Sequence, residues 1–398
     1  MINMRKILSL LFAVVFLILQ TGCIYAFYGR TEISRIEFIR AVGVDKCPGE
    51  KNTVRLTIAT ERVQADSGGG GERKKSEILT SDGSTVFEAV RNFWNYMEKR
   101  PFWGHLEYVL IGEEAAKEGL TKYIDFFSRD PEVRLNLKVY IAKGLAAEEV
   151  VNRSSGEDKF VFDRLQGVTE NQWGQSIFNV VNLFEVMYIL DNKSLSLYLP
   201  SFELSQFTTD TNEQVDIVMK GFAIFKGDKL MGYLDEKMGR GLNWLRNKVN
   251  SGIIVVKSPK TNNVSLEIIE SRSKFVPEII NGQLSVTIKV IMSSNIAEIQ
   301  STEDLFTEEA MRFLETKQEQ KIKEEIESVI RYAQERKLEF FGTAYAVEHK
   351  YPIEWEDNYE KNWGEVASHI NFNVIVESKI NRTYDIKQPN RGKDGVQI

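Results

Sequence analysis

Cysteine and histidine are scarce in this chain, which has 2 cysteines and 3 histidines among 398 residues. The histidines, His105, His349 and His369, stand far apart, and none has the spacing of an H-x-x-x-H or H-E-x-x-H motif. Structural roles are therefore favoured for them over a metal or catalytic site. Acidic residues outnumber basic ones, 57 to 51, and the formal net charge of −6 argues against a nucleic-acid partner.

The motifs of common enzyme classes are also missing. The four glycines at 68–71 are not a phosphate-binding loop, because no strand leads directly into them and no Gly-Lys-Ser or Gly-Lys-Thr follows. No G-x-S-x-G turn occurs. Glu354, Glu356 and Asp357 surround Trp355 and could form a sugar-handling carboxylate pair, but a solvated loop is the simpler interpretation. We therefore predict a protein without enzyme activity, cofactor or metal.

The N-terminal leader has the layout of a secretory signal peptide. Arg5 and Lys6 precede an apolar run from Ile7 to Leu19, whose 13 residues are fewer than the about 20 that span a bilayer as a helix. Small residues then lead to Cys23, in a segment that resembles the lipobox of bacterial lipoproteins, although Gln20 stands where Leu, Val or Ile is usual. The resemblance implies that Cys23 carries a diacylglyceryl group and begins the mature chain. An ordinary secreted protein, or an uncleaved anchor followed by a buried cysteine, is the alternative.

Cleavage before Cys23 would leave 376 residues, enough for two or three domains. The leader takes two basic residues with it, so the mature chain would be more acidic and would not be drawn to anionic lipid by net charge. The acyl chains would then supply the anchoring. Cys47 would be left without another cysteine, so no internal disulfide is expected.

The N-terminal half predicts alternating strands and helices. A capping box formed by Thr85 and Glu88 begins the first helix, and Pro101 ends it. The Gly-rich and charged stretch at 66–77 is expected to be a mobile surface loop, and it is our candidate for contact with a partner. Strands are expected at 38–45, 54–59, 106–111, 135–141 and 197–204, and helices at 85–100, 113–127 and 177–190.

The C-terminal half begins again with strands and then carries one long amphipathic helix. Lys226-Gly227-Asp228 predicts a tight hairpin. The helix is expected at 302–337, and we predict that its apolar stripe packs on the domain's own sheet because an exposed stripe would promote aggregation. Strands are expected at 215–225, 229–234, 253–256, 264–269, 284–292 and 370–376. The apolar stripe consists of Ile322, Ile326, Val329, Ile330 and Ala333, and the face expected to be solvated carries Lys321, Glu325, Glu327 and Arg331.

These patterns predict an α+β fold of layered mixed sheets with packed helices, in two to three domains, with the long amphipathic helix in the C-terminal domain. The polar stretch at 206–214 is the best boundary. The predicted organisation is a signal peptide at 1–22, an N-terminal domain at 23–205, a linker at 206–214, a C-terminal domain at 215–386 and a polar tail at 387–398.

One segment, Arg100 to Ala115, combines a Gly-His pair before a strand with Ile-Gly-Glu-Glu after it. His105 is predicted to be structural there. The segment is similar to a motif of the C subunits of bacterial spore germinant receptors, the Ger(x)C family, and further stretches match that family in the same order over nearly the whole mature chain. These stretches are Arg30–Ile33, Gly43–Lys46, Ser84–Ala89, Phe126–Arg134, Gly221–Leu230 and Phe340–Gly342, with Tyr351-Pro352 and Trp363 beyond. The chain departs from the family at Ile24-Tyr25, where Trp-Asp is common, and at Tyr384, where the family often has Gly.

The resemblance implies a non-enzymatic lipoprotein of a sporulating bacterium, with acyl chains such as palmitate on Cys23. It would lie on the outer face of the spore inner membrane, beside integral-membrane subunits of the same nutrient germinant receptor, and would be needed for spore germination. No catalytic, cofactor or metal residue is implied. The alternatives are a solute-binding lipoprotein of a transporter, which needs two similar lobes where these halves look dissimilar, and a cell-wall hydrolase with carboxylates near Trp355.

Overall fold

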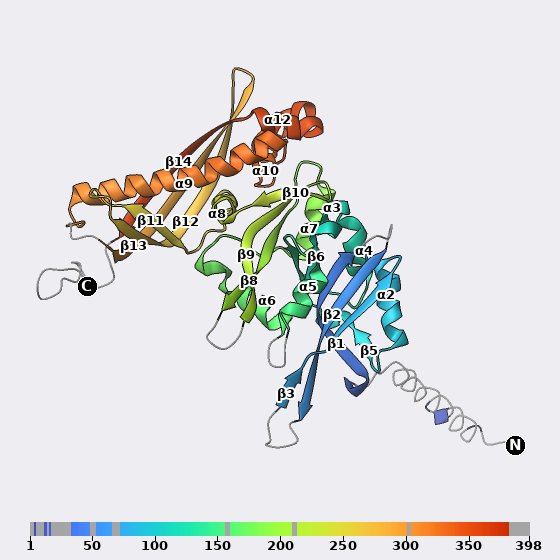
Figure 1. Ribbon diagram of the computed structural model, residues 1–398. Helices are drawn as coiled ribbons and strands as arrows, with labels where there is room; N and C mark the ends of the chain where they lie inside the picture. The colour runs from blue at the N-terminus through green and yellow to red at the C-terminus, as the bar shows by residue number, and fades with distance from the viewer. Residues whose placement is uncertain are drawn as a thin grey trace, which may run out of the picture.

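The structure is a computed structural model that describes residues 33–47, 53–65, 72–155, 160–208, 213–300 and 304–381, with isolated positions 4, 12, 13 and 16. The fold is α+β, as predicted, with two mixed sheets and helices packed on them (Figure 1). Cys23 and the predicted tail at 387–398 lie outside the described residues. Among the described residues, no helix combines the length and the apolar character that crossing a bilayer requires.

The larger sheet has the strand order β10-β9-β8-β7-β6-β1-β2-β3, with β4 paired to β2 and β5 paired to β1. Its centre is parallel, because β6 pairs in parallel with both β1 and β7, and β7 pairs in parallel with β8. The outer pairs are antiparallel hairpins. The strands are β1 (Ile36–Lys46), β2 (Val54–Ala65), β3 (Glu72–Lys75), β4 (Ile78–Gly83), β5 (Arg100–Phe102), β6 (Tyr108–Gly112), β7 (Lys138–Ala142), β8 (Tyr198–Thr208), β9 (Glu213–Lys226) and β10 (Lys229–Leu234).

The helices of this half are shorter than the sequence pattern predicts. The expected helix at 113–127 is two helices, because Gly119 between them has a φ of +144°. The helix expected at 177–190 begins only at Leu183. It buries Leu183, Val186 and Ile189, whereas Phe184 and Met187, which the sequence pattern placed on the apolar face, are exposed. The elements are η1 (Ile33–Arg35), α2 (Val86–Asn92), η2 (Phe93–Asn95), η3 (Trp103–His105), α3 (Glu113–Glu118), α4 (Thr121–Arg129), α5 (Ala147–Arg153), α6 (Val161–Glu170), η4 (Asn171–Gly174), α7 (Leu183–Asp191) and α8 (Glu236–Leu245).

The second sheet has the order β11-β12-β13-β14, and the long helix α9 lies along it (Figure 1). Strands β12 and β13 form a long hairpin whose turn, Asn281-Gly282, has positive φ at both residues, as a type I′ turn requires. The final strand, β14, is parallel to β13. The elements are β11 (Ile253–Lys257), β12 (Asn263–Ile280), β13 (Gln283–Ile299), α9 (Glu308–Arg336), α10 (Thr343–Lys350), α11 (Pro352–Glu354), the π-helix η5 (Trp355–Tyr359), η6 (Glu360–Asn362), α12 (Trp363–His369) and β14 (Asn371–Asn381).

The apolar stripe of α9 is buried as predicted, but the opposite face is not solvated throughout. Glu325 is 1% exposed, and its carboxylate accepts hydrogen bonds from Arg240 Nε at 2.9 Å and Trp244 Nε1 at 3.1 Å. Both partners lie on α8. The helices approach so closely that a Cβ on Gly241 would lie 2.4 Å from the carbonyl oxygen of Glu325. The junction between α8 and α9 therefore covers a face that the sequence assigned to solvent.

Two polar stretches predicted as loop or linker carry strands. Residues 72–75, within the expected mobile loop at 66–77, form β3 and pair with β2, while 66–71 lie outside the described residues. At 206–214, the ends of β8 and β9 pair with each other. Strands β9 and β10 thus continue the larger sheet, and the division of the chain at 206–214 stays a prediction.

Candidate functional site

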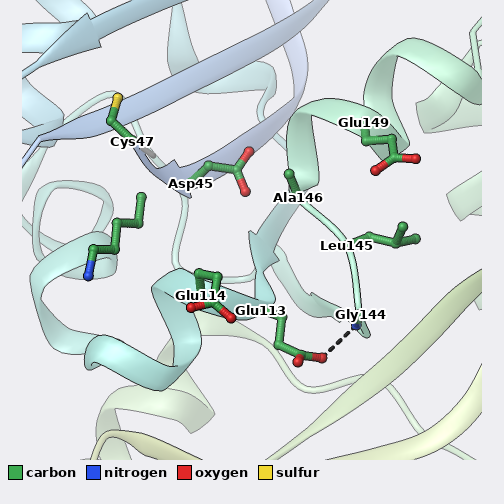
Figure 2. Close-up of a pocket in the computed structure, with 9 residues that line it drawn as sticks. Asp45, Cys47, Glu113, Glu114, Gly144, Leu145, Ala146 and Glu149 are labelled. Atoms are coloured by element: carbon green, nitrogen blue, oxygen red, sulfur yellow. Dashed lines mark hydrogen bonds between the residues drawn. The ribbon is translucent and has the colours of Figure 1, made fainter. Parts of the chain in front are cut away.

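The residues of two sequence motifs meet at the carboxyl ends of β1, β6 and β7. Ligands of sheets with parallel strands are commonly bound at this edge. A cavity of about 410 Å³ opens there, which we call the carboxylate pocket (Figure 2). It is lined by Asp45, Lys46, Cys47, Glu113, Glu114, Gly144, Leu145, Ala146 and Glu149.

Asp45, at the end of β1, is the buried carboxylate of this pocket. Its Oδ1 accepts the backbone N–H of Ala147 and its Oδ2 that of Glu148, each at 2.7 Å. These N–H groups belong to the first turn of α5, so Asp45 caps that helix from a distant part of the sequence. Burial raises the pKa of Asp45 to about 6, although both hydrogen bonds favour the charged form.

Glycine is required beside Asp45 because the backbones approach so closely. A Cβ on Gly112 would lie 1.9 Å from Asp45 Oδ1 and 3.2 Å from the backbone nitrogen of Ala147. A Cβ on Gly43, two residues before Asp45, would meet Ala147 at 3.1 Å. The Gly-Val-Asp-Lys and Ile-Gly-Glu-Glu stretches therefore form one packed junction, which brings together the ends of β1 and β6 and the beginning of α5.

Glu113, the next residue after β6 and the first of α3, links this helix to β10 and to the turn after β7. Its Oε2 accepts the N–H of Gly144, shown in Figure 2, and the hydroxyl of Tyr233 on β10 at 2.7 Å. Its Oε1 pairs with Lys117 Nζ at 2.7 Å. Burial opposes ionisation of Glu113, but the hydrogen bonds from Lys117, Tyr233 and Gly144 outweigh it and lower its pKa. Glu113 is thus held as a carboxylate between α3 and β10.

The other acidic side chains of the pocket also have partners. Glu114 pairs with Lys117 at 2.9 Å, and Glu149 pairs with Arg153 at 2.6 Å. Among the described residues, no three His, Cys, Asp or Glu side chains are arranged to hold a metal ion. A general acid or base must reach its substrate, whereas these carboxylates are engaged by the protein's own N–H, O–H and ammonium groups. Asp45 and Glu113 hold strand ends and helices together, whereas the pairs made by Glu114 and Glu149 lie within α3 and α5.

The segment Arg100–His105 is hydrogen-bonded to Glu132, in the segment that follows α4. Asp130 accepts the N–H of Glu132 at 2.9 Å, and Glu132 in turn accepts hydrogen bonds from the Arg100 guanidinium and from the backbone N–H of Trp103. His105 ends η3 instead of starting a strand. Its ring is exposed and stacks on Phe38, with the ring centroids 4.6 Å apart. The Arg-Asp-Pro-Glu stretch at 129–132 therefore contacts the residues that lead into the Gly-His pair at 104–105.

Asp228, in the hairpin turn between β9 and β10, explains the break in the expected helix at 113–127. Its carbonyl oxygen accepts the N–H of Leu120 at 2.7 Å, and its carboxylate accepts the N–H of Thr121 at 3.3 Å. A Cβ on Gly119 would lie 3.0 Å from the same carboxylate. The turn predicted at Lys226-Gly227-Asp228 is confirmed, and it caps the beginning of α4.

The remaining sequence candidates are not brought together. His349 and His369 lie on α10 and α12, and both are exposed. Trp355 is buried against Trp363, with the ring centroids 4.8 Å apart, while the neighbouring Glu356 is exposed. The solvated interpretation of the acidic residues here is supported, although they lie in a helical turn instead of a loop.

Comparison with known proteins gives family matches over most of the chain. The sequence model described as "Spore germination protein N-terminal domain" matches residues 29–204. The one described as "Spore germination B3/ GerAC like, C-terminal" matches residues 220–384. The chain belongs to the Ger(x)C family of spore germination proteins. It therefore has a role in spore germination, and its family is that of a germinant receptor subunit, not a known enzyme class.

Individual relatives agree with this assignment. The chain is 24% identical over 400 residues to "Spore germination protein KC" of Bacillus subtilis (strain 168), covering 95% of this chain and 96% of the relative. It is also 24% identical over 354 residues to "Putative spore germination protein YfkR" of the same organism, covering 86% and 90%. A solved structure described as "Crystal Structure of the GerBC protein" has the same fold, with a TM-score of 0.57 and 20% identity, covering 85% of this chain and 96% of that one.

Proposed function

We propose that this protein is a lipid-anchored, non-enzymatic subunit of a nutrient germinant receptor. It lies on the outer face of the spore inner membrane, attached through Cys23, and assembles with integral-membrane subunits of the same receptor. The observation that carries the proposal is the match of both halves of the chain to the spore germination families. The leader that ends at Cys23 supports the anchor.

The geometry of the carboxylate pocket supports a non-enzymatic role. Asp45 is occupied by two backbone N–H groups, and Glu113 is occupied by Gly144, Tyr233 and Lys117. These carboxylates line the pocket, but an active site would also leave such a group free to bind its substrate. Here the acidic groups instead fix the strand ends and helices, which suits a scaffold subunit.

Replacing Cys23 with Ala tests the anchor. We expect the Cys23→Ala chain to lose labelling by radioactive fatty acid and to leave the membrane fraction, because the thiol is the acylation site. Cys47→Ala is the matched control, since Cys47 is buried in the folded protein and is expected to leave labelling unchanged. Labelling that persists in Cys23→Ala would contradict the anchor.

A germination assay with nutrients tests the receptor function. Spores that lack this chain are expected to release less dipicolinate when mixtures of amino acids, sugars and nucleosides are added, and the wild-type gene should restore the release. The Cys23→Ala gene should restore it only in part, because the subunit would no longer be held at the membrane. Normal release from the deletion strain with every nutrient would contradict the receptor assignment. Binding of a nutrient by the isolated chain in equilibrium dialysis would instead favour a solute-binding lipoprotein.

A further inference from the structure

Three aromatic side chains are exposed on the segment that contains α2 and η2, and the hydroxyl of one of them, Tyr96, donates to the carbonyl oxygen of Thr80 at 2.6 Å. Phe87 is 50% exposed, Trp94 is 52% exposed and Tyr96 is 50% exposed. Large aromatic side chains at this exposure, gathered within ten residues, indicate an interaction surface. We call Phe87, Arg91, Trp94 and Tyr96 the aromatic patch.

Arg91 gives the aromatic patch a cationic centre. Its guanidinium lies over the Phe87 ring at 5.1 Å and over the Trp94 ring at 5.2 Å. Its charge has no carboxylate partner among the described residues, whereas the neighbouring Arg129 pairs with Asp125. The guanidinium is therefore free to meet an anionic group above the rings.

A groove beside the patch adds apolar depth. It has a volume of about 870 Å³ and lies between α2 and α4. Phe87 and Phe126 line it, with their ring centroids 5.9 Å apart, and the lining also carries the cations Arg91, Lys122 and Arg129 and the carboxylates Asp125 and Asp130. Aromatic rings, a cation and a shallow apolar groove on one face are the chemistry of the lipid headgroup region, where Trp and Tyr concentrate and basic side chains meet phosphate.

Tyr96, at one end of the aromatic patch, is near the point where the chain enters the fold, whereas Phe87 follows β4, whose last residue Gly83 is level with Lys46 at the far end of β1. Ile36, at the start of β1, pairs with Arg100 of β5, and Tyr96 is four residues before Arg100. The beginning of β1 lies beside β5 (Figure 1). Cys23 is 13 residues before Ile36, so an acyl group on it reaches at most about 45 Å from Ile36, and Tyr96 lies within about 20 Å of the same residue. With the anchor of the proposed function, the beginning of β1 therefore stays within about 45 Å of the bilayer.

We propose that the aromatic patch is the membrane-facing surface of the protein and inserts its rings among the headgroups of an anionic bilayer. The inference rests on the lipid anchor of the proposed function, because the anchor makes this weak contact intramolecular. Arg91 binds lipid phosphate, while Trp94 and Tyr96 lie at the level of the ester groups. The second sheet and α9 then project away from the bilayer, where they are accessible to partner subunits.

Tryptophan quenching by brominated lipid tests this orientation. The full lipidated chain is reconstituted in phosphatidylcholine vesicles that contain brominated acyl chains. Trp94 and Trp173 are 52% and 50% exposed, whereas the other tryptophans of the folded part, Trp103, Trp244, Trp355 and Trp363, are at most 5% exposed. We expect Trp94→Phe to lose most of the lipid-dependent quenching and the matched control, Trp173→Phe, to keep it.

The role of Arg91 is tested by adding phosphatidylglycerol to the same vesicles. Quenching should increase in the wild-type chain and stay unchanged in Arg91→Gln, because the glutamine cannot pair with the added phosphate. Equal quenching in Trp94→Phe and the wild type would overturn the proposal. A Trp94 that is not quenched in vesicles but is shielded from solvent in purified receptor complexes would also overturn it, because the patch would then bind a protein partner. Failure of the anchor is distinct, since the wild-type chain would then not float with the vesicles.

Discussion

The buried pair between Arg240 and Glu325 fixes the junction of α8 with α9, and its removal should destabilise the protein strongly. The change is Glu325→Ala. The side chain of Glu325 is 1% exposed and that of Arg240 is 13% exposed, so the substitution leaves a largely desolvated guanidinium without its carboxylate. It also removes the acceptor of the buried Trp244 N–H.

The magnitude follows from the burial of both partners. Removing one partner of a buried ion pair costs about 3–5 kcal/mol, because the charge left behind is uncompensated. Arg240 also donates to the carbonyl oxygen of Ile253 at 2.9 Å, which keeps part of its hydrogen bonding. We therefore expect the free energy of unfolding to fall by about 3 kcal/mol. Replacing both residues with apolar ones, Arg240→Met with Glu325→Leu, should restore most of this loss.

Urea unfolding followed by tryptophan fluorescence measures the effect, because Trp244 lies in the junction. With two sheets, more than one transition is expected, and the comparison uses the transition that Trp244 reports. Glu327→Ala is the matched control on the same helix. Its side chain is 45% exposed and pairs only loosely with Lys323, at 3.8 Å, so it should change stability by less than about 0.5 kcal/mol. Equal effects of the two substitutions would refute the reasoning.

Three further predictions concern the N-terminal half. Gly112→Ala should lower the free energy of unfolding by about 1–3 kcal/mol in urea, since the new Cβ would meet Asp45. The control Gly167→Ala, whose Cβ meets nothing within 4 Å, should instead raise it by about 0.5–1 kcal/mol. The contribution of Asp45 to stability should fall by ~3 kcal/mol as the pH rises from about 4 to about 6, because its raised pKa makes the folded state bind the proton more tightly than the unfolded state. The contribution is measured as the difference between the pH–stability profiles of the wild type and Asp45→Asn, and identical slopes would contradict it. His105→Ala should lower the free energy of unfolding by the ~0.5–1.5 kcal/mol of an aromatic stack on Phe38, seen as a slightly lower melting temperature. A fully stable variant that fails to support germination would point to a direct role of His105.

Local sequence patterns predicted an element correctly where its position is signalled by its own residues. The side chain of Thr85 accepts the N–H of Glu88 at 3.1 Å, so the capping signal marked the beginning of α2 correctly. The spacing of Ile322 and Ile326 identified the buried stripe of α9, and Lys226-Gly227-Asp228 identified a hairpin. In each case the pattern that carries the prediction lies within a few residues along the chain.

The candidate site was visible in the sequence only as separate motifs. Gly112 and Asp45 are 67 residues apart in the sequence, and nothing in either stretch shows that the glycine is needed to admit the carboxylate. The same holds for Glu113 and its partner Tyr233. The order of the motifs identified the family, but the pairing of β1 with β6 brought them together.

The acidic composition and the α+β pattern follow from the sequence alone, as does the prediction of a leader that ends at Cys23, because each depends on residue type and local spacing. Only the tertiary structure decided that Glu325 is buried, that Gly119 divides a helix and that residues 72–75 pair as a strand. These outcomes depend on partners far away in the sequence: Arg240 for the carboxylate, Asp228 for the glycine and β2 for the strand. A buried charge or an extended polar segment is stable only when such a partner satisfies it, and local sequence does not carry that information.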